Sequence, residues 1–230
     1  GRSWQHANGA FMTVARLGID TGYEAAAVYA WSRKVGFEQV APLKGLEGFN
    51  RSAPVSGPTY VDATIGGKRL RREARLWSVA TATFKAETYR LLRIERPSDE
   101  DRALGVLDAP GTVHIPGWAD SEWLKQLVAE QLVTIRNKRG YAHQEWQKMR
   151  ERNEALDCRV YARAAAWILG ADRWDEATWR RLEAQAGVET RLPAAVLTAT
   201  ETAASAAPKA GTLTTPRRKR RTYTPNFMRD

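Results

Sequence analysis

One stretch of eleven residues does most to define the fold of this 230-residue chain: Arg152-Asn153-Glu154-Ala155-Leu156-Asp157-Cys158-Arg159-Val160-Tyr161-Ala162. It lies within residues 144–169, the longest helical pattern of the sequence, which contains no Pro or Gly and stops at Gly170. We therefore expect one long helix over this range. Asp157 lies among apolar residues of that helix, and an ionised carboxylate in such surroundings is costly unless something pairs with it. The partner is either Arg152 or Arg163, or a bound cation.

A second acidic residue, Asp20, follows an apolar run with β-branched residues at positions 13–19, which predicts a buried strand. Residues 24–34 then have Ala and aromatic residues at helical spacing, and residues 37–44 have a strand pattern that Gly45 breaks. This order predicts a parallel strand–helix–strand unit with the Asp20 carboxylate at the edge of the sheet. Alternatively, Asp20 is the N-cap of the helix that follows, because Asp is a favoured capping residue.

The rest of the chain up to residue 190 alternates short strand and helix patterns, so we expect a mixed α/β domain over residues 1–190. Loops are expected at residues 46–58 and 97–110, strands at 59–62, 76–79, 112–115 and 132–136, and helices at 83–94, 120–130 and 174–186.

The chain has a formal net charge of +10, and half of this charge lies near its end. Residues 194–230 hold seven basic and two acidic residues, a net charge of +5. Composition over residues 191–230 shifts to Ala, Thr, Ser and Pro and then to a basic run, which predicts a flexible, disordered tail. Strong basic charge indicates a nucleic-acid partner, or a charge that only aids solubility. No apolar stretch approaches the roughly 20 residues that a membrane span needs, so we expect no membrane partner.

Acids from separate elements can converge on divalent cations, because Mg²⁺ prefers carboxylate oxygens. Two such cations about 3.5–4 Å apart can clamp a phosphodiester. A strand end and a helix face could bring Asp20 and Asp157 together in this way. Glu154 lies three residues before Asp157, on the same helix face. Glu154 is then a further ligand, a group that assists the ligands, or the salt-bridge partner of Arg150 or Lys148.

The stretch from Arg152 to Ala162 resembles the closing motif of the nuclease domain in lambda-type phage terminase large subunits. Further segments resemble that domain in the same order, and together they cover residues 4–187. These segments are residues 4–9, 17–22, 43–45, 75–79 followed by Lys85, and 127–133.

The resemblance implies an RNase H-like fold, in which helices flank a mixed sheet. It also implies a two-metal endonuclease that uses Mg²⁺ or Mn²⁺ to cut concatemeric double-stranded DNA during viral genome packaging. By the same resemblance, Asp20 and Asp157 are metal ligands and catalytic residues. Glu154 is expected to assist them from its position on the same helix face. Contacts to the DNA backbone are expected from basic residues of the domain and the tail, each of which is alternatively a solvated surface charge: Lys44, Lys85, Arg152, Arg217, Arg218, Lys219, Arg220 and Arg221.

In this family a first catalytic aspartate lies on an earlier strand, so we expect that the chain begins after it and that the nuclease domain is truncated on its N-terminal side. Cutting by the chain alone would then depend on the upstream segment, and the alternative function is a non-catalytic DNA-binding or portal-docking module. No Gly-x-x-x-x-Gly-Lys-Ser/Thr loop occurs in the sequence, so ATP hydrolysis is not expected of it. The expected partners, in the host cytoplasm, are double-stranded DNA, the terminase small subunit and, through residues 223–230, the procapsid portal protein.

Overall fold

The computed structural model describes residues 3–5, 9–65 and 67–187, which belong to one unit of the chain, Gly1–Val188. The tail expected over residues 191–230 lies outside the described residues, and so does its basic run, residues 217–221. No helix within the described residues is both long enough and apolar enough to cross a membrane.

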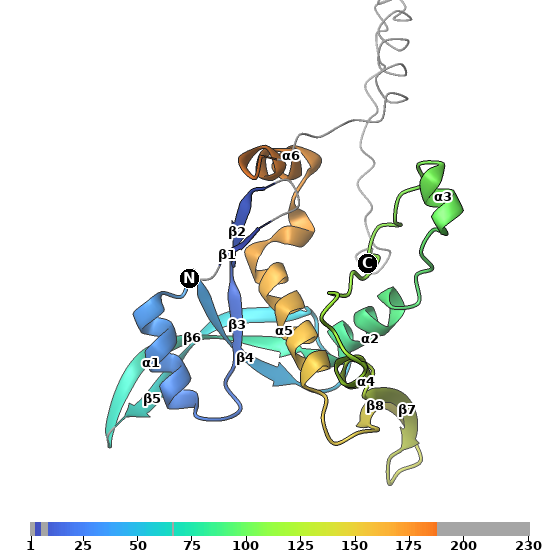
Figure 1. Ribbon diagram of the computed structural model, residues 1–230. Helices are drawn as coiled ribbons and strands as arrows, with labels where there is room; N and C mark the ends of the chain where they lie inside the picture. The colour runs from blue at the N-terminus through green and yellow to red at the C-terminus, as the bar shows by residue number, and fades with distance from the viewer. Residues whose placement is uncertain (1–2, 6–8, 66, 188–230) are drawn as a thin grey trace, which may run out of the picture. The chain divides into compact units, whose positions relative to one another are not determined.

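The main sheet has four strands in the order β3-β4-β6-β5 (Figure 1). β3 (Leu17–Asp20), β4 (Val40–Leu46) and β6 (Lys68–Ala80) run parallel, whereas β5 (Val55–Ile65) is antiparallel to β6. Helix α1 (Ala25–Val35) joins β3 to β4 and so confirms the parallel strand–helix–strand unit that the sequence predicts. The mixed sheet and its flanking helices also confirm the expected mixed α/β class.

Two short ribbons and several helices accompany this sheet (Figure 1). The ribbons are β1 (Ser3–Gln5) with β2 (Phe11–Thr13), and β7 (Glu130–Arg136) with β8 (Ala142–Lys148). The remaining helices are α2 (Thr81–Leu91), α3 (Asp99–Ala103), α4 (Ser121–Leu127), α5 (Glu154–Leu169), the 3₁₀ turn η1 (Ala171–Arg173) and α6 (Glu176–Gln185).

The hydrophobic core lies where α5 and α2 pack against the main sheet. Leu156, Val160 and Ala164 recur every four residues along α5, so they share one helical face, and all three are buried. Phe84 of α2 packs into the same cluster and is only 2% exposed. The strands contribute the rest of the cluster: Ala41, Leu43, Val55, Trp77 and Val79.

Gly18 allows helix α5 to lie close to strand β3. A Cβ atom at this position would be 2.6 Å from Leu43 Cδ1 and 3.1 Å from the carbonyl oxygen of Tyr161. Contacts this short would force the helix backbone or the leucine side chain to move. The glycine therefore sets the distance between two elements that also carry Asp20 and Asp157.

The single long helix predicted over residues 144–169 is wrong. Its first part is β8, which pairs in continuous register with β7, and α5 begins only at Glu154. The absence of Pro and Gly permits a helix but does not require one. Cross-strand pairing with β7 outweighs the helix propensity of these residues, which include the good helix formers Gln, Glu and Lys.

Three smaller expectations also differ from the structure. The strand ending at Asp20 is not buried, because β3 is an edge strand and its Leu17 is 43% exposed. Gly45 lies within β4 instead of ending it. Residues 112–115 belong to none of the described sheets, and without a pairing partner so short an apolar stretch remains irregular.

Replacing Phe84 by alanine should lower the free energy of unfolding by about 3–5 kcal/mol, because it leaves a cavity in the core beneath α5. The matched control is Phe11→Ala, since Phe11 is 72% exposed and its replacement should cost less than about 1 kcal/mol. Urea unfolding followed by circular dichroism measures both values. Equal losses for the two variants would contradict the position assigned to this core.

Candidate active site

A cleft of about 540 Å³ opens where β3 and β4 end and where α2, β7 and α5 begin. Ligands of parallel sheets commonly bind outside the carboxyl ends of the strands, and this cleft has that position. Its lining residues carry both signs of charge: the acids are Asp20, Glu47, Glu130 and Asp157, and the bases are Lys44, Lys85 and Lys148.

The structure brings Asp20 and Asp157 together in this cleft, from the end of β3 and the first turn of α5. Asp20 Oδ1 accepts a hydrogen bond from the Tyr161 hydroxyl (3.0 Å), and Oδ2 accepts one from the Gly22 amide (3.1 Å). Burial and the neighbouring Asp20 carboxylate raise the pKa of Tyr161, so its hydroxyl stays protonated and remains a donor. The alternative role of Asp20 as a helix N-cap is wrong, because α1 is preceded by Glu24 as its N-cap residue.

Asp157 is a partly buried carboxylate whose charged form is disfavoured. Burial raises its pKa, nearby Lys85 opposes that rise, and Glu130 and Asp20 add to it. The two arginines considered as its ion-pair partners are engaged elsewhere. Arg152 pairs with Glu154, and Arg163 pairs with Glu87 and Asp172.

Glu154 does not line the cleft. Its side chain is 57% exposed and forms a salt bridge with Arg152 at 3.3 Å. A salt bridge was expected as one alternative, but with Arg150 or Lys148. A hydrogen bond from its own backbone amide and the charge of Arg152 lower the pKa of Glu154. Together with Asp20 and Asp157 it borders a separate, largely apolar groove between β3 and α5.

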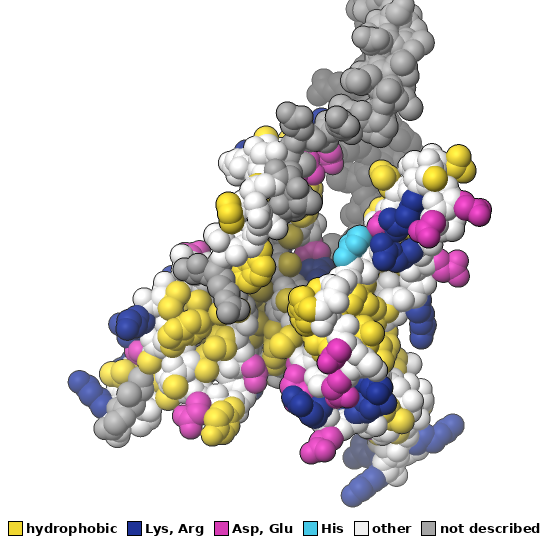
Figure 2. All heavy atoms as spheres, viewed as in Figure 1, with side chains coloured by type: hydrophobic (Ala, Val, Ile, Leu, Met, Phe, Trp, Pro, Cys, Tyr) yellow, Lys and Arg dark blue, Asp and Glu magenta, His cyan; other side chains and the backbone are white. Residues whose placement is uncertain are grey.

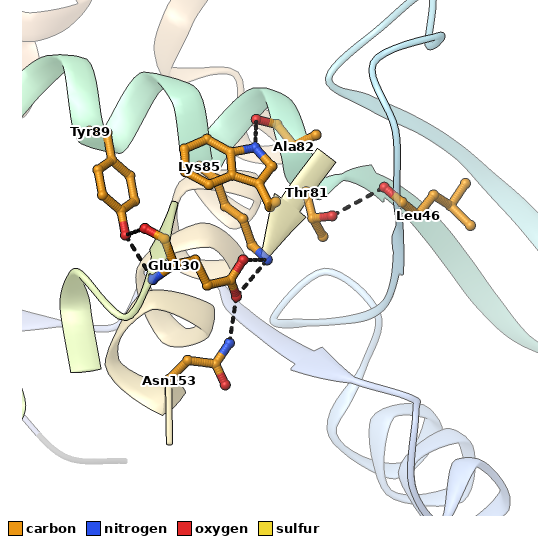
Figure 3. Close-up of polar contacts among 8 residues, drawn as sticks. Leu46, Thr81, Ala82, Lys85, Tyr89, Glu130 and Asn153 are labelled. Carbon is orange, nitrogen blue, oxygen red and sulfur yellow. Dashed lines mark hydrogen bonds and ion pairs between the residues drawn. The ribbon is translucent and has the colours of Figure 1, made fainter. Parts of the chain in front are cut away.

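Glu130, a third acid in the cleft, has no recognisable pattern in the sequence. It is the first residue of β7 and is 3% exposed. Lys85 Nζ donates to both carboxylate oxygens, at 2.8 and 2.6 Å, and Asn153 Nδ2 donates to Oε1 at 2.8 Å (Figure 3). The Tyr89 hydroxyl donates to the Glu130 carbonyl oxygen and accepts from its amide at 3.0 Å.

The predicted DNA-contacting cations of the domain divide into two groups. Lys44 and Lys85 line the cleft, whereas Arg152 is exposed and is not part of the lining. Lys85 is not a solvated surface charge, because its side chain is 14% exposed and held by Glu130. Lys148 is an exposed cleft residue that sequence reasoning missed, since it was placed inside a helix when it ends β8.

Asp20 and Asp157 are the two acids of the cleft whose neighbouring carboxylates fit a shared divalent cation. No cation of the described residues forms an ion pair with either, and a bound metal would offset the unfavourable burial of Asp157. Within the described ranges, however, no group of three or more His, Cys, Asp or Glu side chains is gathered closely enough to hold a metal. The pair therefore fits a cation that takes its other ligands from water and a phosphate, as Mg²⁺ commonly does.

Comparison with known proteins gives a single family. Residues 1–179 match the family model described as the terminase large subunit gpA, endonuclease domain. The terminase large subunit of Escherichia phage lambda is 33% identical over 177 residues, which are 75% of this chain and 25% of that protein. The terminase large subunit of Enterobacteria phage P21 is 32% identical over 174 residues, with the same coverage of each chain.

The chain thus spans about a quarter of the length of the curated relatives it matches. No solved structure matches it. The family model covers the whole main sheet, Asp20 and Asp157 of the cleft, and all of α5. The chain therefore belongs to the family of the endonuclease domain of the terminase large subunit gpA.

Proposed function

We propose that this chain is a metal-dependent endodeoxyribonuclease that cuts concatemeric double-stranded DNA during the packaging of a phage genome. The observation that carries the proposal is the position of Asp20 and Asp157, which come from a strand end and a helix face and line one cleft with three lysines. This arrangement supports an RNase H-like fold as the finer description of the mixed sheet.

Asp20 and Asp157 would hold Mg²⁺ or Mn²⁺. When bound, the ion supplies activation of water and electrostatic stabilisation of the phosphodiester. The chain contributes the orientation of the ligands, because Tyr161 and the Gly22 amide each hold one oxygen of Asp20. No Ser or Cys nucleophile is needed for this reaction.

The lysines of the cleft would bind the substrate through its phosphates, which dominate affinity for DNA. Lys44 and Lys148 are exposed at the cleft. Lys85 has three donor hydrogens, and its contacts with the two Glu130 oxygens leave one for a phosphate oxygen. Glu130 would thereby orient Lys85 while keeping its charge inside the cleft.

The two-metal form of the reaction needs more acidic ligands than this pair. Glu130 is held by Lys85, and Glu154 pairs with Arg152 beside the neighbouring groove. Glu47 is the other acid that lines the cleft. Glu154 would assist only if it exchanged Arg152 for a cation. Among the described residues no three acids are close enough to hold a metal together, which favours the second candidate function, a non-catalytic DNA-binding or portal-docking module.

As part of a packaging motor, the chain would act with a terminase small subunit and with the procapsid portal protein, in the host cytoplasm. Residues 217–221, proposed to contact DNA, and residues 223–230, proposed to dock on the portal, both lie in the tail outside the described residues.

Replacing Asp20 or Asp157 should strongly reduce cutting. Asp20→Ala and Asp157→Ala should each reduce the Mn²⁺-dependent cleavage of linear plasmid DNA on the order of 100-fold or more, because each removes a ligand. The matched control is Asp99→Asn, an exposed acid in the first turn of α3, which should cut at the wild-type rate. Unchanged cutting by Asp157→Ala would refute the role of that residue.

The stability of Asp157→Asn should depend on pH and metal. Burial raises the pKa of Asp157 in the folded chain, so its ionised form costs stability at neutral pH, and asparagine removes that cost. In EDTA the variant should be more stable than wild type near pH 7.5. The gain should shrink as the pH falls through the raised pKa and vanish below about 4, where aspartate is protonated in the unfolded chain as well.

Urea unfolding between pH 4 and 8 measures this difference, and Mn²⁺ should raise the melting temperature of wild type but not of the variant. A variant less stable than wild type at pH 7.5 in EDTA would contradict the assigned environment of Asp157.

Breaking the buried Lys85–Glu130 pair should separate folding from activity. Glu130→Gln leaves the Lys85 charge buried and unpaired, which should cost about 3–5 kcal/mol of stability. The double variant Lys85→Met/Glu130→Leu should regain part of that loss in urea unfolding, but not all of it, because the buried Asn153 amide loses its acceptor. Its DNA cleavage should stay slower than that of wild type, because no ammonium group then contacts the phosphate.

Glu145→Gln is the control for the single change, since Glu145 lies on β8 and is 42% exposed. Wild-type cutting by the double variant would show that Lys85 serves the fold alone.

A further inference from the structure

The β7–β8 hairpin is fixed to the cleft at its base. Trp146 Nε1 donates to the Ala82 carbonyl oxygen at 3.3 Å, and its ring lies 5.0 Å from that of Tyr89. Glu130 and Lys148, which pair with each other in the register, both line the cleft. These contacts hold the base of the hairpin against α2 and the cleft (Figure 3).

The free end of the hairpin is basic and exposed. Arg136, Lys138 and Arg139 are exposed there, and residues 136–143 contain no Asp or Glu. None of the ion pairs among the described residues involves these three side chains. Tyr141 beside them is 70% exposed. In Figure 2 Lys and Arg side chains lie at the lower right, where Figure 1 places the end of this hairpin.

The turn that carries these cations is ordered by its own hydrogen bonds. Asn137 Oδ1 accepts hydrogen bonds from the backbone amides of Arg139 (2.9 Å) and Tyr141 (3.0 Å). The backbone amide of Asn137 donates to the Tyr141 carbonyl oxygen at 2.9 Å. Gly140 has a φ of +81°, a value that favours glycine in such a turn. The basic side chains therefore start from a fixed backbone, which lowers the entropy lost when they bind a ligand.

The dimensions of the hairpin suit duplex DNA. Each strand has 7 residues in continuous antiparallel register, which corresponds to a ribbon of about 24 Å at roughly 3.4 Å per residue. The major groove, about 12 Å wide, admits a two-stranded ribbon. Lys148 lies at the cleft end and Lys138 at the far end, so cations occur at both ends of the ribbon.

We infer that the β7–β8 hairpin is a DNA-binding arm that lies along the major groove of double-stranded DNA and contacts the flanking phosphates, which places the duplex backbone over the cleft. This inference rests on the proposed nuclease function and adds the surface that holds its substrate. The contacts are to phosphates, so binding through the arm is independent of sequence.

A second basic hairpin serves as the matched control. The β5–β6 turn presents Lys68, Arg69 and Arg71, but Arg69 already bonds Asp62 through Nε and Nη2 at 3.1 and 2.8 Å. None of these three residues lines the cleft. Removing three charges there lowers the net charge by the same amount as removing three from the arm.

The test compares two triple variants, Arg136→Gln/Lys138→Gln/Arg139→Gln and Lys68→Gln/Arg69→Gln/Arg71→Gln. Fluorescence anisotropy with a labelled 30-base-pair duplex, in EDTA and across 50–200 mM KCl, gives the affinity and its salt dependence. Each phosphate contact contributes a slope of about −0.9 to the plot of log affinity against log salt. The slope of the arm variant should be shallower than that of wild type by about 2–3, and the variant should bind the duplex at least about 10-fold more weakly than wild type.

The slope of the control variant should differ from that of wild type by no more than about 0.9, the contribution of one phosphate contact. Equal effects of the two variants, or wild-type binding by the arm variant, would overturn the inference. Asp157→Asn separates it from the nuclease proposal: this variant should bind DNA with the wild-type slope and fail to cut. Normal cutting by Asp157→Asn, with binding lost in the arm variant, would refute the nuclease site and leave the arm standing.

Discussion

The buried ion pair between Lys85 and Glu130 connects the elements that form the cleft. Lys85 comes from α2 and Glu130 from the start of β7, while Asn153, directly before α5, donates to the same carboxylate. Separating these groups would leave a charge in a site that is 2% exposed on the glutamate side. The starts of α2, β7 and α5 are therefore held together, and the position of Asp157 in the first turn of α5 depends on that constraint.

The cleft that results disfavours the charged form of Asp157 and favours a bound cation beside it. Burial and the nearby acids both raise the pKa of Asp157. A carboxylate with a raised pKa destabilises the fold at neutral pH. Carboxylates of this kind in clefts are therefore candidates for functional residues. Lys44 and Lys148, exposed at the same cleft, supply attraction for a polyanion. A divalent cation would bind at Asp20 and Asp157, and the DNA phosphates would bind at the lysines. The scissile phosphodiester would then lie next to the cation, as hydrolysis assisted by a metal ion requires.

The sequence allowed much of this site to be predicted. Asp20 and Asp157 stood out because each is an acid beside an apolar pattern, and the strand–helix–strand order placed Asp20 at a sheet edge. Glu130 could not be found in the same way, since it begins a strand after Ala129 with no periodic pattern around it. Its partners Lys85 and Asn153 are 45 and 23 residues away in the sequence. Only the three-dimensional fold brings them together.

The first strand of the β7–β8 hairpin was predicted at residues 132–136, but its second strand, β8, was missed for a related reason. Residues 144–148 fit a helix as well as a strand by composition alone, and the pairing of Gln144 with Thr134 decides between them. Once β8 is recognised, Lys148 moves from a helix surface to the cleft, and the basic turn becomes the end of an arm. The sequence thus located Asp20, Asp157, Lys44 and Lys85, whereas strand pairing was needed to place Lys148 at the cleft.

The central claim is that Asp20 and Asp157 share one divalent cation in the cleft. Isothermal titration of the chain with Mn²⁺, in the absence of DNA, tests it most directly. Asp20→Asn and Asp157→Asn should each weaken Mn²⁺ binding by at least about 10-fold, and the double variant should add little to the weaker single variant because both residues hold the same ion. Wild-type Mn²⁺ affinity in both single variants would contradict the claim.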